Sequence, residues 1–175
     1  TPCYASRKQE RTRSPYLVPI YATRNYTWHN SFCLLLSYPR VVSEQVGPKA
    51  GMKYAGKHSY PVICDKSIDE VSAEDIDVLI VPGGWAPDYW RRDERFKKLC
   101  VDMDAAGKLI GTICHGPWLL ISAKILSGRK ITCFHAIKDD VENAGAEWVD
   151  EEVVVDKNLV TSRVPNDLPA FMKAL

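Results

Sequence analysis

The residues best suited to chemistry lie in segment 112–118, where Cys114 and His115 are adjacent. The apolar run Leu109–Ile113 predicts a buried strand, and Pro117 is a favoured first helical residue because its missing N–H costs nothing there. Cys114 is therefore expected at a sharp strand-to-helix turn, where unpaired N–H groups and the helix dipole favour the thiolate. His115 titrates near neutral pH and can take up and return a thiol proton. The pair predicts nucleophilic catalysis by sulfur.

A glycine-rich turn precedes this segment in the chain. Residues 77–81 form a short apolar run that ends at Pro82, Gly83 and Gly84, which predicts a strand covered on both faces. Because glycine has no Cβ, a substrate carbonyl can approach the backbone here. The N–H groups of Gly84 and His115 could then stabilise an oxyanion formed when sulfur attacks. A tight turn that merely needs positive φ would explain the same glycines.

Strand and helix patterns alternate around these two turns. We expect helices at 93–106, 117–126, 138–144 and 166–175, and strands at 109–113, 130–134, 147–149, 152–155 and 159–162. The last three strands are expected to form an antiparallel end, with a turn at 156–158. The alternation predicts an α/β sandwich with a mainly parallel sheet, in which sites lie at the carboxyl ends of strands. Both turns lie at such ends.

The composition of the chain changes at Gly47. Residues 1–46 contain no Gly, no Asp, six Lys or Arg and two Glu, whereas all ten glycines lie from Gly47 onward. Apolar patches in the first part are interrupted by Pro15, Pro19 and Pro39, so no strand or helix period persists. We therefore expect an atypical N-terminal segment, 1–46, followed by an α/β domain, 47–175.

Composition and charge argue against several classes of protein. The chain has 175 residues and a net charge of +1, so one globular domain is expected, with neither nucleic acid nor membrane as a partner. No apolar run reaches the roughly 18 residues of a membrane span or the roughly 7 of a signal-peptide core, so a cytoplasmic protein is expected. The six cysteines include no C-x-x-C pair, and His29, His58 and His135 lack metal-ligand spacing. We expect no disulfide framework, metal or cofactor.

The two turns and several shorter motifs resemble the ThiJ/PfpI family of intracellular cysteine peptidases and deglycases. The matching motifs occur in the right order from about residue 47 to 175, at 81–88, 112–118, 128–130, 136–140, 143–150 and 161–163. The resemblance implies a flavodoxin-like three-layer sandwich of the class I glutamine amidotransferase-like fold. It also implies homo-oligomers in which a neighbouring subunit completes the site, and peptidase, deglycase or glyoxalase activity on small peptides or carbonyl adducts.

The same resemblance implies roles for individual residues. Cys114 matches the nucleophile and His115 the adjacent base, while Asp88 matches a carboxylate that a neighbouring subunit presents to the histidine. Taken without the resemblance, Asp88 is more simply a helix-capping side chain. The expected pocket residues are Gly83, Trp85, Pro117, Trp118, Phe134 and His135.

Two departures from the family pattern bear on activity. The family has a hydrophobic first strand followed by an acidic motif whose Glu approaches the sulfur, and neither Glu10 nor Glu44 has matching surroundings. Residues 1–46 must fill that strand position, because losing a central strand would cost more than the roughly 5–15 kcal/mol that stabilise a typical domain. Where relatives commonly have Tyr-Pro, this chain has Phe134 and His135, which removes a phenol hydroxyl from the pocket.

Alternatives to a cysteine hydrolase stay open at this point. A redox-sensing or chaperone-like stress protein would use Cys114 as a low-pKa thiol that peroxide oxidises first. An inactive variant would lack the acidic partner of the sulfur. A glutamine amidotransferase also uses a cysteine turn on this fold, but it needs a distant histidine near the C-terminus, and no histidine follows His135.

Overall fold

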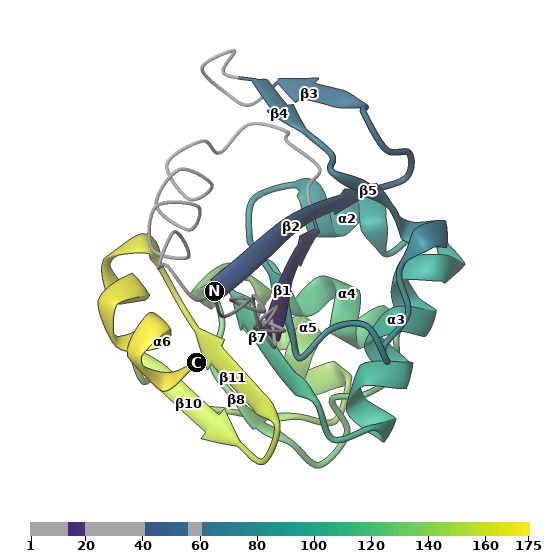
Figure 1. Ribbon diagram of the computed structural model, residues 1–175. Coiled ribbons are helices and arrows are strands. Elements are labelled where there is room, and N and C mark those ends of the chain that lie inside the picture. The colour runs from purple at the N-terminus through teal and green to yellow at the C-terminus, as the bar shows by residue number, and fades with distance from the viewer. Residues whose placement is uncertain (1–13, 20–40, 56–60) are drawn as a thin grey trace, which may run out of the picture.

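The computed structural model describes residues 14–19, 41–55 and 61–175, and a seven-stranded sheet forms the centre of this part of the chain (Figure 1). The strands of this sheet are β1 (Ser14–Pro19), β2 (Val41–Gly47), β5 (Lys66–Ser67), β6 (Val78–Val81), β7 (Leu109–Ile113), β10 (Val153–Asp156) and β11 (Leu159–Ser162). Their order is β10-β11-β7-β6-β1-β2-β5, and all neighbours are parallel except β10 and β11. The predicted mainly parallel sheet is confirmed.

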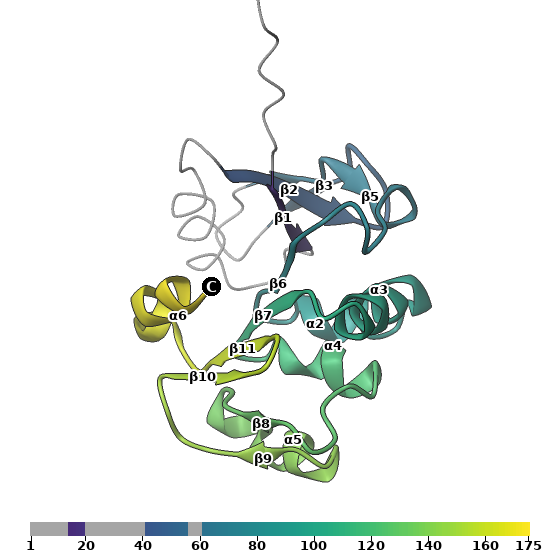
Figure 2. The same cartoon turned by 60° about the horizontal axis from the view of Figure 1, so that its bottom comes forward.

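Helices cover both faces of the sheet. They are α2 (Ala86–Trp90), α3 (Glu94–Ala105), α4 (Pro117–Ser122), α5 (Lys138–Asn143) and α6 (Leu168–Ala174), with short 3-10 helices at Ile68–Glu70, His135–Ile137 and Pro165–Asp167. Helix α6 lies on one side and α2, α3 and α4 lie on the other (Figure 2). On β6, Val78 and Ile80 belong to the core that includes α6, whereas Leu79 and Val81 belong to the core that includes α3 and α4. The flavodoxin-like three-layer arrangement follows, because alternate residues of a strand face opposite layers.

Strand β1 occupies the position of the first central strand. It pairs with β2 along its whole length, starting with Ser14 opposite Val41, and with β6 on its other side. The expectation that residues 1–46 fill this position is confirmed, although their sequence shows no strand period. Pro15 and Pro19 conceal the strand in the sequence, because proline has no N–H to donate to a neighbouring strand and is rare in central strands. The pairing of β1 with β6 is correspondingly short, at two residue pairs. The remaining residues of β1 are enough to place it between its neighbours.

Two small sheets flank the central one, and one of them corrects a prediction. Strands β3 (Lys53–Ala55) and β4 (Pro61–Ile63) pair antiparallel, whereas β8 (Lys130–Ile131) and β9 (Glu147–Trp148) pair in parallel. β9 therefore does not belong to the antiparallel end of the chain, which consists of β10 and β11 alone.

The helix that starts at Pro117 is shorter than expected because Lys124 adopts a φ of +60°, which a right-handed helix cannot include.

A buried arginine fastens the β10–β11 turn to α3. Arg129 is only 8% exposed and donates to the carboxylates of Asp104 and Asp156, each at 3.1 Å, and to Oδ1 of Asn158 at 2.9 Å. Asn158 in turn donates to Asp104 at 3.0 Å. Every charge of this cluster is paired, which a buried ionic group requires. The cluster holds β11 beside β7, whose end carries Cys114.

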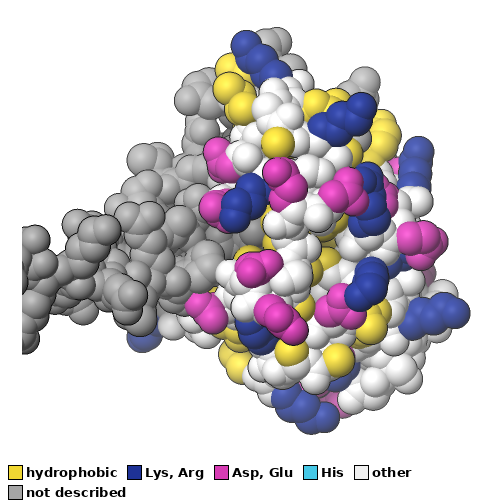
Figure 3. Space-filling view, turned by 45° about the vertical axis from the view of Figure 1, so that its right-hand side comes forward, with side chains coloured by type: hydrophobic (Ala, Val, Ile, Leu, Met, Phe, Trp, Pro, Cys, Tyr) yellow, Lys and Arg dark blue, Asp and Glu magenta, His cyan; other side chains and the backbone are white. Residues whose placement is uncertain are grey.

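The face of the molecule that carries α3 mixes both signs of charge (Figure 3). Ion pairs along this helix account for much of the mixing, such as Lys98 with Asp102 and Arg95 with Asp93. Alternating signs do not form the one-signed field that attracts nucleic acid to a surface. Among the described residues, none of the helices has the length and apolar character of a membrane span.

Candidate active site

Cys114 lies in a strained turn between β7 and α4. Its φ is +60°, a left-handed conformation that costs a non-glycine residue roughly 1–3 kcal/mol. Backbone hydrogen bonds hold this geometry: the Cys114 N–H donates to the Ser162 carbonyl, and its own carbonyl accepts from the Phe134 N–H, both at 3.1 Å. Pro117 is buried at the first position of α4. The sharp strand-to-helix turn expected from the sequence is present.

Glycines let the turn after β6 pack directly against the cysteine. A Cβ on Gly83 would lie 2.6 Å from the Cys114 Cβ and 3.3 Å from its Sγ. A Cβ on Gly116 would lie 2.5 Å from the carbonyl oxygen of Val81, at the end of β6. Gly84 has a φ of +78°, which glycine adopts without strain. The two turns therefore meet with no room for larger residues at these positions.

The sulfur is buried beside an imidazole nitrogen. Cys114 Sγ lies 3.2 Å from Nδ1 of His115, and Cys114 is only 6% exposed. Burial raises the pKa of the Cys114 thiol to about 11, although hydrogen bonds from the backbone N–H groups of Gly84 and His115 act in the opposite direction. In the single chain, loss of solvation therefore favours the neutral thiol over the thiolate expected from the sequence. Helix α4 has only six residues, so its dipole is small and the loss of solvation dominates.

His115 has the properties of a neutral base. Burial lowers its pKa below the ordinary value, while the charge of Asp140 raises the pKa and that of His135 lowers it. A neutral imidazole next to a protonated thiol can accept the proton as the sulfur attacks, without an ion pair existing beforehand. The geometry thus favours general-base activation of Cys114.

Aromatic rings surround His115 on several sides. The ring centroids of Trp118, Phe134 and Trp85 lie 4.8, 4.9 and 6.4 Å from that of His115. Trp85 is 51% exposed, so the aromatic wall reaches solvent on its side. His135 contacts Phe134 at 4.3 Å between centroids and is itself exposed. The structure therefore brings together most of the residues expected to line a pocket.

Asp88 of α2 has its observed side-chain contact with Arg92, just beyond the end of that helix. Arg92, one turn further along, forms an ion pair with the Asp88 carboxylate and donates from Nε to its carbonyl oxygen at 3.1 Å. The alternative role as a cap is wrong, because Asp88 lies inside α2 and the N-cap residue is Trp85, which makes no side-chain capping bond. The carboxylate is 32% exposed and thus open to a further partner.

An acidic residue near the sulfur is missing from the segment that follows β1. Residues 20–43 contain no Asp or Glu. Glu44 lies on β2 and pairs with Lys66 of β5 at 2.9 Å, and Glu10 lies outside the described residues. Among the residues that the structure describes, no group of three or more His, Cys, Asp or Glu could hold a metal ion.

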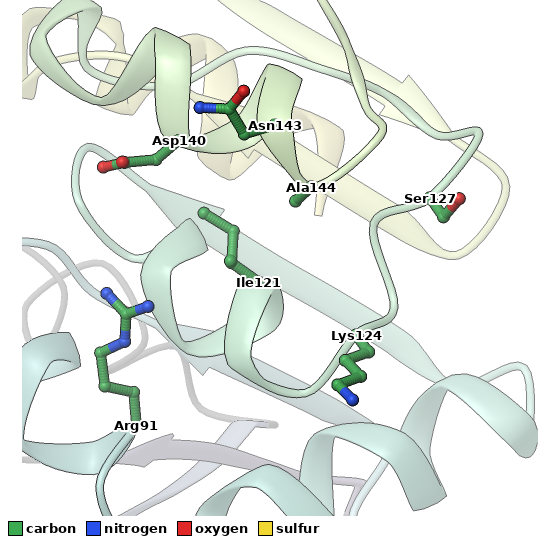
Figure 4. A pocket seen from close by; sticks show the side chains of 7 residues that line it. All are labelled: Arg91, Ile121, Lys124, Ser127, Asp140, Asn143 and Ala144. Atoms are coloured by element: carbon green, nitrogen blue, oxygen red, sulfur yellow. The ribbon is translucent and has the colours of Figure 1, made fainter.

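Sequence reasoning gave no role to Asp140 and Arg91, which both contact Trp118. The Trp118 indole N–H donates to Asp140 Oδ2 at 2.8 Å, and the Arg91 guanidinium lies 6.0 Å from the Trp118 ring centroid. Both residues line a surface pocket of about 380 Å³ beside α4 and α5 (Figure 4). The other residues that line it are Ile121, Lys124, Ser127, Asn143 and Ala144. The available signal was Trp118 itself, since a partly buried indole N–H usually has an acceptor.

Comparison with known proteins places these features in a family. Residues 39–175 match the DJ-1/PfpI family. The chain belongs to the DJ-1/PfpI family. It is 54% identical over 125 residues to "Protein/nucleic acid deglycase 2" of Escherichia coli, which covers 70% of this chain and 73% of that protein. It is 50% identical over 118 residues to "Deglycase PfpI" of Pyrococcus furiosus, which covers 67% and 71%.

A solved DJ-1/PfpI structure extends the comparison to most of the chain. A two-domain protein from Anabaena variabilis, with DJ-1/ThiJ/PfpI-like and ferritin-like domains, superposes with a TM-score of 0.88 at 34% identity. The superposition covers 92% of this chain and 46% of that chain. The sequence match to the DJ-1/PfpI family begins within two residues of β2, so β1 precedes the matched region although it completes the same sheet.

Proposed function

We propose that this protein is a cysteine-dependent hydrolase of the PfpI type, acting on carbonyl adducts of amino groups in small molecules or peptides. The observation that carries the proposal is the contact of Cys114 Sγ with His115 Nδ1 at 3.2 Å, in a strained turn at the carboxyl end of β7. Two similar proteins are named deglycases, which favours carbonyl adducts over peptide bonds as substrates. Family membership supports a small-molecule or peptide substrate.

The proposed reaction begins from the neutral thiol. Sγ attacks the carbon of the adduct that carries both the amine and a hydroxyl, so that a C–S bond forms as the C–N bond breaks, and the thiol proton passes through Nδ1 of His115 to the leaving amine. The N–H groups of Gly84 and His115 already act on the sulfur, so an oxyanion on the attached carbon would form beside them. The hemithioacetal that results becomes a thioester when its C–H proton moves to the neighbouring carbonyl carbon and its hydroxyl proton to the oxygen of that carbonyl, with His115 as the proton carrier. Water then attacks the thioester, the C–S bond breaks, the acid product leaves, and the thiol is restored.

We further propose that the protein works as a homo-oligomer in which Asp88 of a neighbouring subunit orients His115. The partly exposed carboxylate lies on α2 close to two exposed aromatic residues, Trp85 at 51% and Tyr89 at 43%. Such a mixture of aromatic and charged groups suits a protein interface. Mixing experiments test this directly: inactive Cys114→Ser and inactive Asp88→Ala subunits should regain activity together only if the site is shared. Failure to regain activity in mixed oligomers of verified composition would overturn the shared site.

The hydrolase itself is tested with a methylglyoxal adduct of Nα-acetyl-lysine, whose side-chain amine is free to form the adduct, and with a fluorogenic peptide in parallel. Cys114→Ser is expected to lose activity by about 10³-fold or more. Cys64→Ala is the matched control, because Cys64 is also buried but belongs to the loop after β4. Equal activity in wild type and Cys114→Ser would refute the proposal. Absence of turnover together with selective sulfenic acid formation at Cys114 would favour the redox-sensing alternative.

A further inference from the structure

Three contacts connect a carboxylate on α5 to the nucleophile of the same chain. Asp140 Oδ2 accepts the Trp118 indole N–H at 2.8 Å. The Trp118 ring meets the His115 ring edge-on, with centroids 4.8 Å apart and planes at 61°. His115 Nδ1 then lies 3.2 Å from Cys114 Sγ. The contacts form a continuous series from Asp140 to the sulfur.

The Trp118 ring is restrained on several sides, so it can in turn restrain the position of the His115 ring. Arg91 lies over the ring at 6.0 Å, and its Nε donates to Ser122 Oγ of α4 at 2.9 Å, which fixes the guanidinium in turn. Trp85 contacts Trp118 with a centroid distance of 6.1 Å. Figure 4 shows Asp140 and Arg91 at one end of the pocket, away from Lys124 and Ser127. The indole is therefore set between a carboxylate, a cation and two neighbouring rings.

We propose that Asp140 is a positioning residue, which holds the His115 ring against Cys114 through the Trp118 indole; the proposal rests on the hydrolase function proposed above. A histidine base works only when its ring is held in one orientation, and a second polar group usually provides that restraint. Here the restraint reaches the His115 ring through its packing against Trp118, because the Asp140 carboxylate binds Trp118 and not His115 itself. It comes from the same chain, and so it acts whatever the oligomeric state.

Asp140 also supplies charge to the same ring. Among the residues that the structure describes, the titratable and charged groups near His115 are Cys114 in its own turn, His135 before α5, Arg91 beyond Trp118, and Asp140. Asp140 is the anionic member of this set and favours the imidazolium that forms when the thiol proton is taken up. Position and charge can be separated by substitution, because asparagine keeps an acceptor oxygen for the indole and loses the charge.

A double-mutant cycle tests the positioning role with the methylglyoxal-adduct assay. Trp118→Phe keeps a ring but removes the N–H, and Asp140→Leu removes the acceptor. Each is expected to lower kcat about tenfold with KM within about twofold, and the double variant is expected to lose no more than either single variant. Losses that multiply would show that the two residues act independently and would overturn the proposal. So would an unchanged kcat in Trp118→Phe.

Nuclear magnetic resonance of ¹⁵N-labelled histidine gives a readout that does not depend on turnover. With the His115 signal assigned from a His115→Gln variant, Asp140→Asn is expected to lower the His115 pKa by about 0.3–0.5 unit and Trp118→Phe by less than about 0.2. Asp139→Asn is the matched control, since Asp139 is also an exposed acid in the first turn of α5, and it should leave the pKa unchanged. If wild type shows no turnover, the proposed function fails, whereas equal pKa shifts in the Asp139 and Asp140 variants would refute the role of Asp140.

Discussion

Replacing Gly83 by alanine tests whether the packing of the two turns sets the position of the nucleophile. The added Cβ would lie 2.6 Å from the Cys114 Cβ and 3.0 Å from the Ile113 carbonyl oxygen. Carbon atoms in van der Waals contact stay about 3.5–4.0 Å apart, so the overlap is roughly 1 Å. Gly83 does not have a positive φ, and alanine therefore adds no backbone strain of its own. The perturbation is purely a displacement of one turn from the other.

The expected losses follow from that displacement. Overfilling a well-packed site costs about 1–3 kcal/mol, which should appear as a lower free energy of unfolding. A shift of about 1 Å between reacting groups can lower the rate about 100-fold, so kcat should fall much more than stability alone would suggest. The contact of Sγ with His115 Nδ1, 3.2 Å in the native chain, is the distance that would change.

Gly111→Ala provides the control on β7, the strand that ends just before Cys114. Its Cβ would meet the Leu175 Cδ2 at 2.8 Å, the end of a flexible side chain at the last residue, and the Phe171 Cζ at 3.1 Å, which would have to move by only a few tenths of an ångström. Urea denaturation, turnover of the methylglyoxal adduct and alkylation of Cys114 by iodoacetamide should be measured for both variants. Gly111→Ala should keep kcat within about twofold. The reasoning is refuted if Gly83→Ala retains the native kcat and alkylation rate, or if both variants lose activity equally.

Four further predictions concern buried charge and buried thiols. Arg129→Met leaves the Asp104 and Asp156 carboxylates without their shared cation, so the free energy of unfolding should fall by about 3–5 kcal/mol, and a loss below about 1 kcal/mol in urea denaturation would contradict the role given to this cluster. Burial raises the pKa of the Cys100 thiol to about 12, so the neutral thiol stabilises the fold fully below the ordinary pKa near 9, and this contribution is lost as pH rises above 9. Stability should therefore decline at alkaline pH, and Cys100→Ala should make this decline between pH 9 and 11 less steep by about 1.4 kcal/mol per pH unit. An unchanged decline in Cys100→Ala would exclude this thiol as its cause. Because the pKa of Cys114 is about 11, iodoacetamide alkylation of that residue should rise about tenfold per pH unit from pH 8 to 10, and a plateau at pH 8 would indicate a preformed thiolate. Burial lowers the pKa of His115, so the acidic limb of kcat/KM should lie below pH 6.5, and a limb above that value would exclude His115 as the neutral base.

Continuous apolar runs and caps were sufficient to predict the centre of the fold. The strand expected at 77–81 is β6, and the strand expected at 109–113 is β7 with the same bounds. Helix α3 begins one residue after the expected start, because Asp93 serves as its N-cap and accepts the N–H of Arg95. These elements are fully specified by residues close in sequence. The strained turn that carries Cys114 follows from them, since it lies between β7 and the proline that begins α4.

Strand β1 could not be recognised from its residues, because its stability is not local. Two of its six residues are prolines, and what defines it is the pairing with β2 and β6 on either side. The hydrogen bond of Trp118 with Asp140 was hidden for a related reason: the two residues are 22 positions apart and meet only because α5 packs beside α4. Periodicity describes one element at a time and does not report such contacts.

The ionisation of Cys114 shows what local reasoning omits. The sequence indicates backbone N–H groups and a helix start near the sulfur, and both lower a thiol pKa, but it does not indicate that the cysteine is only 6% exposed. Loss of solvation outweighs the local field and favours the protonated thiol. A preformed thiolate would need no oriented base at the moment of attack, whereas a buried thiol must transfer its proton as the C–S bond forms. In the proposed mechanism the position of the His115 ring controls the rate, and this is why the contacts of Trp118 with His115 and Asp140 are proposed to matter for catalysis.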